Sequence, residues 1–244
     1  MRWIYISPHF DDAVLSCGGL IWEQSRSGTL VEIWTVCGGD AQPGPLSELA
    51  LVCHQAWGFS SSEEVLAARR LENQNAASRV GAETVDFGIP DCIYRHSPTG
   101  ELLYPEQVFA PVHPVDRNLY SDISTALAGE LRPDDIVVGP LAVGGHVDHV
   151  LTRHAIEHLG LPVKYYADIP YLLDHPEQLA SATRALRPLP SPVTKRGLAA
   201  WKKGIASYRS QILMLFQTRE NMDAAISGYW EHEHALQLWQ SADN

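Results

Sequence analysis

The sequence predicts an α/β fold: a Rossmann-like, three-layer α/β/α arrangement with a mostly parallel sheet and helices near the C-terminal end. Short apolar segments rich in β-forming residues alternate with longer segments whose apolar residues recur at helical spacing. The first strand-like segment, 3–7, is followed by a helical pattern over 12–28, and this alternation continues along the chain. Gly28, Gly81 and Gly160 close three of the helical patterns, which is typical of helix C-termini.

The first half of the chain gives the clearest elements. Residues 30–37 (LVEIWTVC) and 83–89 (ETVDFGI) are predicted to be strands. Residues 61–81 open with a Ser and Glu capping pattern and end at glycine, so a helix is expected there. Residues 38–62 contain Gly, Pro and Ser throughout and predict a long loop, which in a compact domain is usually functional or mobile.

The second half begins with another irregular segment, 90–115, which contains five prolines. The elements expected after it are a helix over 115–131, a strand over 134–141, a helix over 145–160, a strand over 163–169 and two terminal helices over 198–216 and 222–239, with a proline-rich segment at 186–192 before the terminal pair. Trp201, Trp230 and Trp239 fall in the terminal helices and are expected to pack in the core or in the interface of a homo-oligomer.

Composition excludes several classes of protein. Of the 244 residues, 45% are hydrophobic and 19% charged, which is an ordinary globular balance. The net charge of -11 argues against nucleic acid as a partner, because phosphate binding relies on Lys and Arg. No apolar run approaches the ~18 residues of a membrane span, and the N-terminal residues lack the features of a signal peptide. The four cysteines are scattered, so a reducing, cytoplasmic environment is expected.

Two short segments concentrate ionisable residues directly after predicted strands. The first is PHFDD at 8–12, after the first strand, and the second is GGHVDHV at 144–150, after the fourth. In sheets of this kind ligands bind at the carboxyl ends of the strands, where the strand order reverses. Both segments are therefore expected to face one crevice.

The residue types in these segments suit a divalent metal. A catalytic zinc typically takes three protein ligands, and His nitrogens and carboxylate oxygens are normal ones. His9 and Asp12 are three residues apart, one helical turn. His149 fits as a third ligand, and His146 would lie on the same helical face. Such sites accept Fe²⁺ and Co²⁺ as well as Zn²⁺.

A purely structural interpretation is also open for each residue taken alone. Asp11 or Asp12 could cap the helix that begins there, because a carboxylate satisfies free amide hydrogens at a helix start. His146 could be an ordinary surface residue. The two segments taken together favour the metal site, because both are placed at the same edge of the sheet.

The paired segments resemble the LmbE/PIG-L family of zinc-dependent N-acetylglucosamine deacetylases. That family carries His-Pro-Asp-Asp-Glu after its first strand and His-x-Asp-His after its fourth. RRLENQNAASRVGA is similar to the family's Arg-x-x-Glu helix, with Arg69 and Glu72 at the matching places, and FGIPDCIY is similar to its third strand and acidic loop residue, here Asp91. The likeness covers most of the chain and implies a single deacetylase domain over 1–244, with a C-terminal helical part from about 195–244.

The resemblance also implies roles for individual residues. His9, Asp12 and His149 would hold the metal, and Asp11 would be the general base. A protonated His146 would stabilise the oxyanion, with Asp148 orienting it or tuning its charge. Arg69 and Asp91 would lie near the sugar or shape its pocket.

Three positions depart from the family pattern. Phe10 replaces the family's proline, and Ala13 replaces a glutamate that would be a partner of the ligands. Some members have a tyrosine two residues before the second motif's first histidine, where this chain has Gly144. Assistance from a tyrosine must then come from elsewhere or be absent.

Together with the candidate metal site, the resemblance implies a metal-dependent hydrolase that removes the acetyl group from an N-acetylated amino sugar or its conjugate. Zinc would activate water, and Asp11 would take the proton and return it to the amine. A metal-dependent phosphoesterase is an alternative, disfavoured because Lys and Arg are nearly absent around both motifs. A non-catalytic sugar- or nucleotide-binding module is another, although it would not require Asp11, and no G-x-G-x-x-G follows a strand.

Overall fold

A seven-stranded sheet organises the chain in the computed structural model, which describes residues 1–233 and 235–242. In the described residues the sheet has the order β3-β2-β1-β4-β5-β7-β6. The strands are β1 (Arg2–Ser7), β2 (Leu30–Thr35), β3 (Glu83–Asp86), β4 (Ile136–Pro140), β5 (Val163–Tyr166), β6 (Leu186–Pro192) and β7 (Ala235–Ser241). Neighbouring strands from β3 to β5 are parallel, whereas β7 runs antiparallel to both β5 and β6. The predicted α/β class with a mostly parallel sheet is confirmed.

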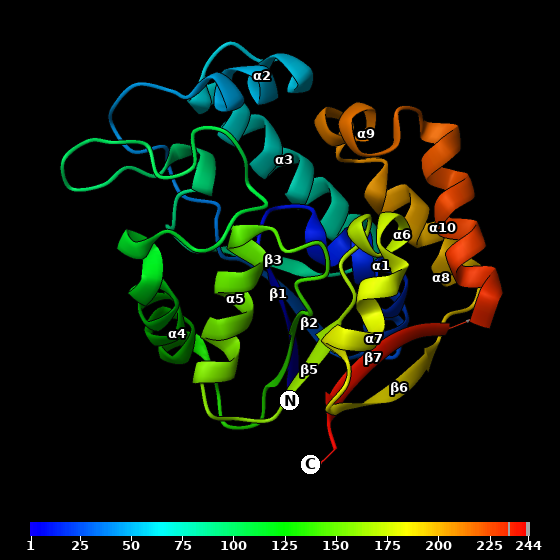
Figure 1. The fold of residues 1–244 in the computed structure, drawn as a ribbon. Coiled ribbons are helices and arrows are strands. Elements are labelled where there is room, and N and C mark those ends of the chain that lie inside the picture. Colours follow the sequence, from blue (N-terminus) through cyan, green and yellow to red (C-terminus); the bar gives the residue numbers. More distant parts are fainter. Residues whose placement is uncertain (234, 243–244) are drawn as a thin grey trace.

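Helices cover both faces of the sheet, with α4 and α5 on one side and α1, α8 and α10 on the other (Figure 1). The α-helices are α1 (Asp12–Arg26), α2 (Glu48–Trp57), α3 (Ser62–Val80), α4 (Leu119–Glu130), α5 (Val147–His158), α6 (Tyr171–Asp174), α7 (Leu179–Ala182), α8 (Lys195–Ile205), α9 (Arg209–Phe216) and α10 (Arg219–Glu233). Short 3₁₀ turns lie at Cys92–Tyr94, Pro114–Asn118 and Pro176–Gln178. No helix of the described residues combines the length and apolarity needed to cross a membrane.

The central strand β1 shows how the sequence builds two apolar layers. Successive side chains of a strand point to opposite faces of the sheet. Ile4 and Ile6 join the core on the side of α4 and α5, whereas Tyr5, between them, joins the core beneath α1 and α8. All three side chains are fully buried. Both faces of β1 are covered, so the residues that follow this strand lie at the edge of the sheet formed by the strands' carboxyl ends.

The order of the strands reverses between β1 and β4. From β1 the chain proceeds outward through β2 and β3, and it then returns to the other side of β1 to form β4. Connections that leave β1 and β4 in opposite directions open a crevice at their carboxyl ends. The segments 8–12 and 144–150 follow these two strands, so the topology brings them together.

The predicted loop over 38–62 is wrong, because it contains the helix α2. Ser47 caps its start by accepting a hydrogen bond from the Ala50 backbone N–H at 3.0 Å. Gly58 ends it in the left-handed conformation. These two signals are visible in the sequence but are separated by only ten helical residues. The predicted irregular segment 90–115 contains only the short 3₁₀ turn at 92–94 and the first residues of another.

The C-terminal region differs most from the prediction. The helix expected over 198–216 is divided into α8 and α9, and the helix expected over 222–239 ends at Glu233 and is followed by β7. Trp239 therefore lies on a strand, and its side chain is buried in the core. Residues 234, 243 and 244 of the predicted helical part lie outside the described residues.

The proline-rich segment 186–192 forms the strand β6. It pairs with β7 on one side only and is the last strand of the sheet. Proline lacks a backbone N–H and is tolerated on such an edge, where that donor has no partner to lose. The pairing of β6 with β7 over seven residue pairs is what fixes both segments as strands.

Candidate metal centre and active site

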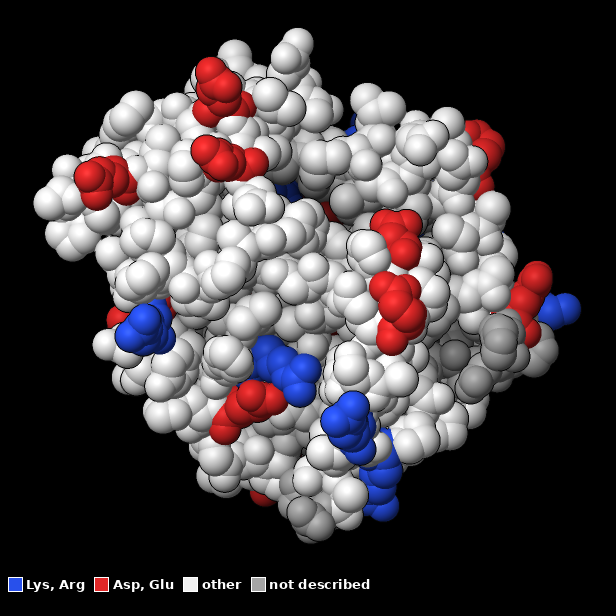
Figure 2. Space-filling model, viewed as in Figure 1, with Lys and Arg blue, Asp and Glu red and all other residues white. Residues whose placement is uncertain are grey.

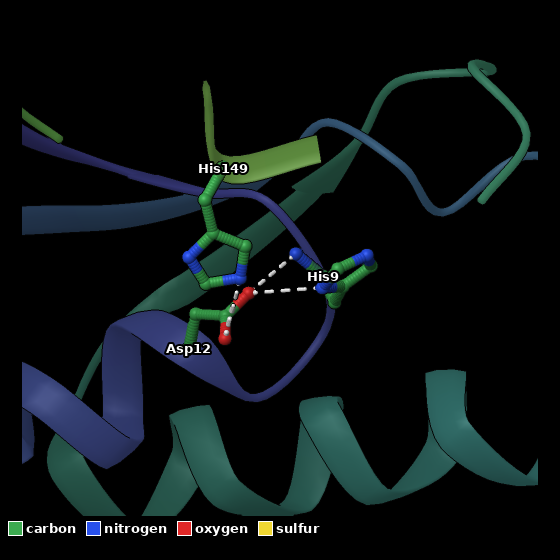
Figure 3. A group of neighbouring side chains, drawn as sticks. All are labelled: His9, Asp12 and His149. Atoms are coloured by element: carbon green, nitrogen blue, oxygen red, sulfur yellow. Dashed lines mark hydrogen bonds and ion pairs between the residues drawn. The ribbon is translucent and has the colours of Figure 1, made fainter. Parts of the chain in front are cut away.

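Three side chains from two distant segments converge at the crevice. His9 lies in the turn after β1, Asp12 begins α1, and His149 lies in the first turn of α5. One ligand atom from each lies within 4.8 Å of the others. The Asp12 carboxylate stands between the two imidazoles (Figure 3), with Oδ2 3.3 Å from His9 Nδ1 and Oδ1 3.4 Å from His149 Nε2. The structure thus brings together the three residues that the sequence predicts as metal ligands.

The helix-capping interpretation of the two aspartates does not describe the geometry. Asp11 occupies the N-cap position of α1, but its side chain makes no capping hydrogen bond. The Asp12 carboxylate instead accepts a hydrogen bond from the backbone N–H of His9 at 2.7 Å. The backbone N–H of Ala13, in the first turn of the helix, donates to the Ser7 hydroxyl at 3.0 Å. Both carboxylates are therefore available to the crevice.

His149 is held in the orientation that a metal ligand needs. Its Nδ1 lies 2.7 Å from Asp168 Oδ1, and its buried Nε2 makes no hydrogen bond within the described residues. A carboxylate on one ring nitrogen fixes the tautomer and leaves the other nitrogen free for a metal. An imidazole nitrogen buried without a partner fits a divalent cation at this position.

Asp168 was not among the residues predicted from the sequence. It follows β5, and its second oxygen accepts a hydrogen bond from the Val143 backbone N–H at 2.9 Å. The only signal in the sequence is its position near the end of the strand predicted over 163–169. Its pairing with His149 depends on the order of the strands, which the sequence alone does not give.

We expect that Asp168→Asn weakens metal binding by about 10- to 100-fold, as replacing such partners of ligands typically does. His149 and Val143 use different oxygens of Asp168, and the amide NH2 that replaces one of them cannot accept a hydrogen bond. Zinc affinity measured by competition with a chelator checks this. Asp174→Asn, at an exposed position in the neighbouring α6, is the control that should bind zinc normally. An unchanged affinity in Asp168→Asn would show that the pairing with His149 is not needed.

The Asp148 carboxylate contacts the His9 ring, whereas it acts on His146 through its charge, the second of the two roles that the resemblance implies. Its Oδ2 lies 3.1 Å from His9 Nε2 and accepts the Cys92 backbone N–H at 3.0 Å. Its Oδ1 forms an ion pair with Arg95 at 2.6 Å. A neutral His9 therefore carries its proton on Nε2, and the lone pair of Nδ1, on the side of Asp12, is left for a metal. Both predicted histidine ligands are thus supported by a buried carboxylate.

Among the residues that the structure describes, two other groups come close enough to share a cation, and both contain Asp148. They are His9 with His146 and Asp148, and Asp91 with Cys92 and Asp148. The Arg95 guanidinium already neutralises Asp148, and a cation placed there would be repelled by it. The group of His9, Asp12 and His149 has no arginine in ion-pair contact with its carboxylate among the described residues, so it is the favoured metal site.

His146 lies beside the ligands with its ring in the pocket. Its Nδ1 accepts the backbone N–H of Asp148 at 3.2 Å, so the proton of the neutral ring is on Nε2. Burial, together with the charges of His9 and His149, lowers the pKa of His146 well below its usual value. Burial, the first of these causes, disfavours the protonated ring that the resemblance implies, and a neutral ring would donate one hydrogen bond from Nε2.

Asp11, Arg69 and Asp91 form the floor of the pocket. The Arg69 guanidinium lies 3.1 Å from Asp11 Oδ1 and 4.0 Å from Asp91 Oδ2, and all three side chains are buried. Burial raises the pKa of Asp11, whereas the charge of Arg69 opposes this and favours the carboxylate. An arginine is therefore present at the site, although none adjoins the two motifs in the sequence. Its charge is already paired with those of Asp11 and Asp91.

The departure at Gly144 is explained by Tyr171. A side chain at position 144 would meet the Tyr171 Cβ at 2.8 Å, and Gly144 has a φ of 87°. The Tyr171 ring occupies this space, packs edge-on against His149 with centroids 5.4 Å apart, and lines the pocket. Burial raises the pKa of Tyr171 well above its usual value, so its hydroxyl stays protonated. A tyrosine thus reaches the site from α6 and not from the motif.

A parallel sheet with a buried His–Asp–His cluster at the carboxyl ends of β1 and β4 defines a class of proteins that can hold a divalent cation. Residues 4–159 match the family described as PIG-L, GlcNAc-PI de-N-acetylase, and the chain belongs to this family. The chain is also 30% identical over 263 residues to the 2'-N-acetylparomamine deacetylase of Niallia circulans, covering 97% of this chain and 93% of that protein.

The chain also resembles solved structures of deacetylases. The zinc inhibited form of teicoplanin deacetylase Orf2 superposes with a TM-score of 0.82 at 25% identity, covering 100% of both chains. The A40926 pseudoaglycone deacetylase Dbv21 superposes with a TM-score of 0.78 at 26% identity, covering 98% of this chain and 96% of the other. The family resemblance predicted from the two motifs is confirmed.

Proposed function

We propose that this protein is a metal-dependent N-deacetylase that hydrolyses the acetamide of an N-acetylated amino-sugar conjugate, with zinc as the metal and Asp11 as the general base. The observation that carries the proposal is the convergence of His9, Asp12 and His149 around one point, with Asp11 beside them but not among the ligands. Its membership of the PIG-L family and the deacetylase names of its relatives support the same reaction.

Different residues of the chain bind the metal and transfer the proton in amide hydrolysis. A divalent metal held by His9, Asp12 and His149 would supply a polarised carbonyl and a water of lowered pKa. Asp11 accepts the proton of the attacking water. The same carboxyl returns that proton to the amine nitrogen as the C–N bond breaks, so that acetate and a free amine leave.

Two hydrogen-bond donors face the pocket where negative charge develops on the acetamide oxygen. His146 offers Nε2–H, because its Nδ1 is occupied by a backbone amide. Tyr171 offers a protonated hydroxyl for which the structure records no hydrogen bond within the described residues. Donors that are already oriented toward a developing oxyanion lower the barrier without further rearrangement.

We expect that Tyr171→Phe lowers kcat on the order of 10- to 100-fold, the loss typical of one hydrogen bond to a charged group. The substitution keeps the ring that packs on His149, so the metal content should stay at the wild-type value. Steady-state kinetics with metal analysis of the same sample check this. A kcat equal to that of the wild type would exclude the hydroxyl from the reaction.

A single assay separates the proposed reaction from its alternatives. The metal-free protein is loaded with one equivalent of Zn²⁺, since excess is avoided where a solved neighbour is described as zinc inhibited. Amine release from N-acetylglucosamine conjugates and phosphate release from a phosphomonoester are then followed in parallel. Amine release that requires the metal is expected. Phosphate release without amine release would indicate a phosphoesterase, and neither activity with retained sugar binding would indicate a binding module.

A further inference from the structure

The pocket above the candidate metal centre changes character from its floor to its mouth. It has a volume of about 350 Å³, and we call its charged lining residues the floor because all four are buried: Asp11, Asp12, Asp91 and Arg69. Its walls come from α2, α9 and the segment before the turn at 114–118, and they are mostly apolar. Figure 2 shows small blue and red areas deep in the hollow between α2 and α9, with white surface around them.

Several large apolar side chains at the mouth are left open to solvent. Phe109 is 51% exposed and Met214 is 45% exposed, and both line the pocket. Leu49, Val108 and Leu215 line it beside them and are partly buried. Exposed apolar residues scattered singly need no explanation, but a group that rims a ligand pocket marks a surface that a ligand covers. We call these five residues the apolar rim.

The two sides of the apolar rim are fixed to the body of the protein. At the start of α9, Ser210 donates from its backbone N–H at 2.9 Å and from its hydroxyl at 2.6 Å to Glu72 of α3. Across the pocket, the Val147 N–H at the start of α5 donates to the Val108 carbonyl at 2.9 Å. The next residue, Phe109, packs edge-on against His146 with centroids 5.7 Å apart. The rim is thus preformed and continuous with the reacting groups.

The apolar rim contains no group that would recognise a charged substrate. Among the described residues that line the pocket, no Asp, Glu, Lys or Arg lies outside the floor. The ammonium groups of an aminoglycoside would lose hydration in this outer pocket without gaining a carboxylate. An alkyl or aryl group would instead be removed from water along with the rim itself, which is favourable.

We infer that the substrate is an N-acetylated amino sugar with an uncharged, apolar aglycone, alkyl or aryl, and that the apolar rim binds this aglycone while the sugar reaches the floor. The inference rests on the proposed deacetylase function and adds the chemical class of the substrate. It separates this chain from the relatives named 2'-N-acetylparomamine deacetylase.

A series of glycosides tests the inference. Amine release by the zinc-loaded protein is measured for N-acetylglucosamine, for its methyl, butyl, octyl and phenyl glycosides below their micellar concentrations, and for 2'-N-acetylparomamine. We expect kcat/KM to rise about two- to fourfold for each methylene that reaches the apolar rim, the effect of burying such a group. We expect the phenyl glycoside to exceed the methyl glycoside, and acetylparomamine to fall below both.

Variants of the rim identify the surface responsible. Met214→Gln on α9 and Phe109→Ser on the opposite side change solvent-exposed side chains, so the fold should tolerate them. At least one is expected to lower the octyl-to-methyl ratio of kcat/KM by about fivefold or more. A change of this size corresponds to losing the burial of one to two methylenes. Leu213→Gln is the matched control, because Leu213 adjoins Met214 on α9 and is 64% exposed but does not line the pocket.

The outcomes distinguish this inference from the proposed function. Deacetylation of all glycosides at one rate, or acetylparomamine as the best substrate, would overturn the inference and leave the deacetylase proposal standing. A chain-length effect that Leu213→Gln removes as fully as Met214→Gln would also overturn it, because binding would then involve the general surface of α9. No amine release from any compound would overturn the proposed function itself.

Discussion

His149→Ala is expected to lose both the metal and turnover, and this is the largest effect that the structure predicts. The imidazole supplies the one ring nitrogen at the site that is buried without a hydrogen bond within the described residues. Without it, only His9 and Asp12 of the three predicted ligands remain. Metal assistance contributes several kcal/mol of charge stabilisation, so kcat/KM should fall on the order of 1,000-fold or more.

The control for this variant lies on the same helix. His154→Ala changes a histidine of α5 that packs against Tyr120 and does not line the pocket. It should retain metal and activity, as measured by elemental analysis and amine release. Because His149→Ala also leaves Asp168 Oδ1 without its partner, circular dichroism is recorded to show that the variant is folded. A folded His149→Ala protein with one zinc and wild-type turnover would contradict the ligand assignment.

Asp11→Asn is expected to retain the metal and to lose most turnover. Asparagine has the shape of aspartate but cannot accept the proton of water and return it to the amine. Positioned acid–base groups typically contribute about 100- to 10,000-fold, so kcat should fall by a factor in this range. Zinc affinity should remain within a fewfold of the wild type, because Asp11 is not among the proposed ligands.

A second ion pair provides the control for the loss of charge at Asp11. Arg69 and Asp11 are 3.1 Å apart, and the adjacent Arg70 forms a pair of the same length with Asp86 outside the pocket. Asp86→Asn removes an ion pair without touching the site, so its kcat should match that of the wild type. If Asp11→Asn kept near-normal kcat at one bound zinc, the assignment of the base would be wrong.

The position of the site could be predicted from the sequence because it depends on local signals. PHFDD and GGHVDHV each follow an apolar strand, and parallel strands present their carboxyl ends at one edge. The pairing of β1 with β4 then places His9 and Asp12 beside His149. Arg69 and Asp91 reach the same pocket, as the family resemblance implies.

The partners of these residues could not be predicted, because they depend on tertiary packing. Asp168 reaches His149 only because β5 lies next to β4, and Arg95 reaches Asp148 from an irregular segment. Tyr171 fills space that a side chain at position 144 would otherwise occupy. None of the three lies within either motif. The orientation of His9 by Asp148 likewise depends on Arg95 and the Cys92 amide, which fix the carboxylate.

The secondary structure likewise depends partly on local sequence and partly on pairing between segments that are distant in the chain. Helical spacing and end signals were sufficient for α1, α3 and α5, whose boundaries lie close to those expected. The residues of β7 carry apolar side chains that suit either a helix or a strand, and the antiparallel partners β5 and β6 decide in favour of the strand. The prolines of β6 are compatible with a strand only because that strand is at the edge of the sheet.

Diffraction from crystals of the zinc-loaded protein, recorded at the zinc absorption edge, locates the cation directly. The account predicts one anomalous peak bonded to His9 Nδ1 and His149 Nε2 at about 2.0–2.1 Å and to an Asp12 oxygen at about 2.0–2.2 Å. Asp11 should lie beside this peak without bonding to it. A peak held by Asp148 and His146 in place of Asp12 and His149 would contradict the account.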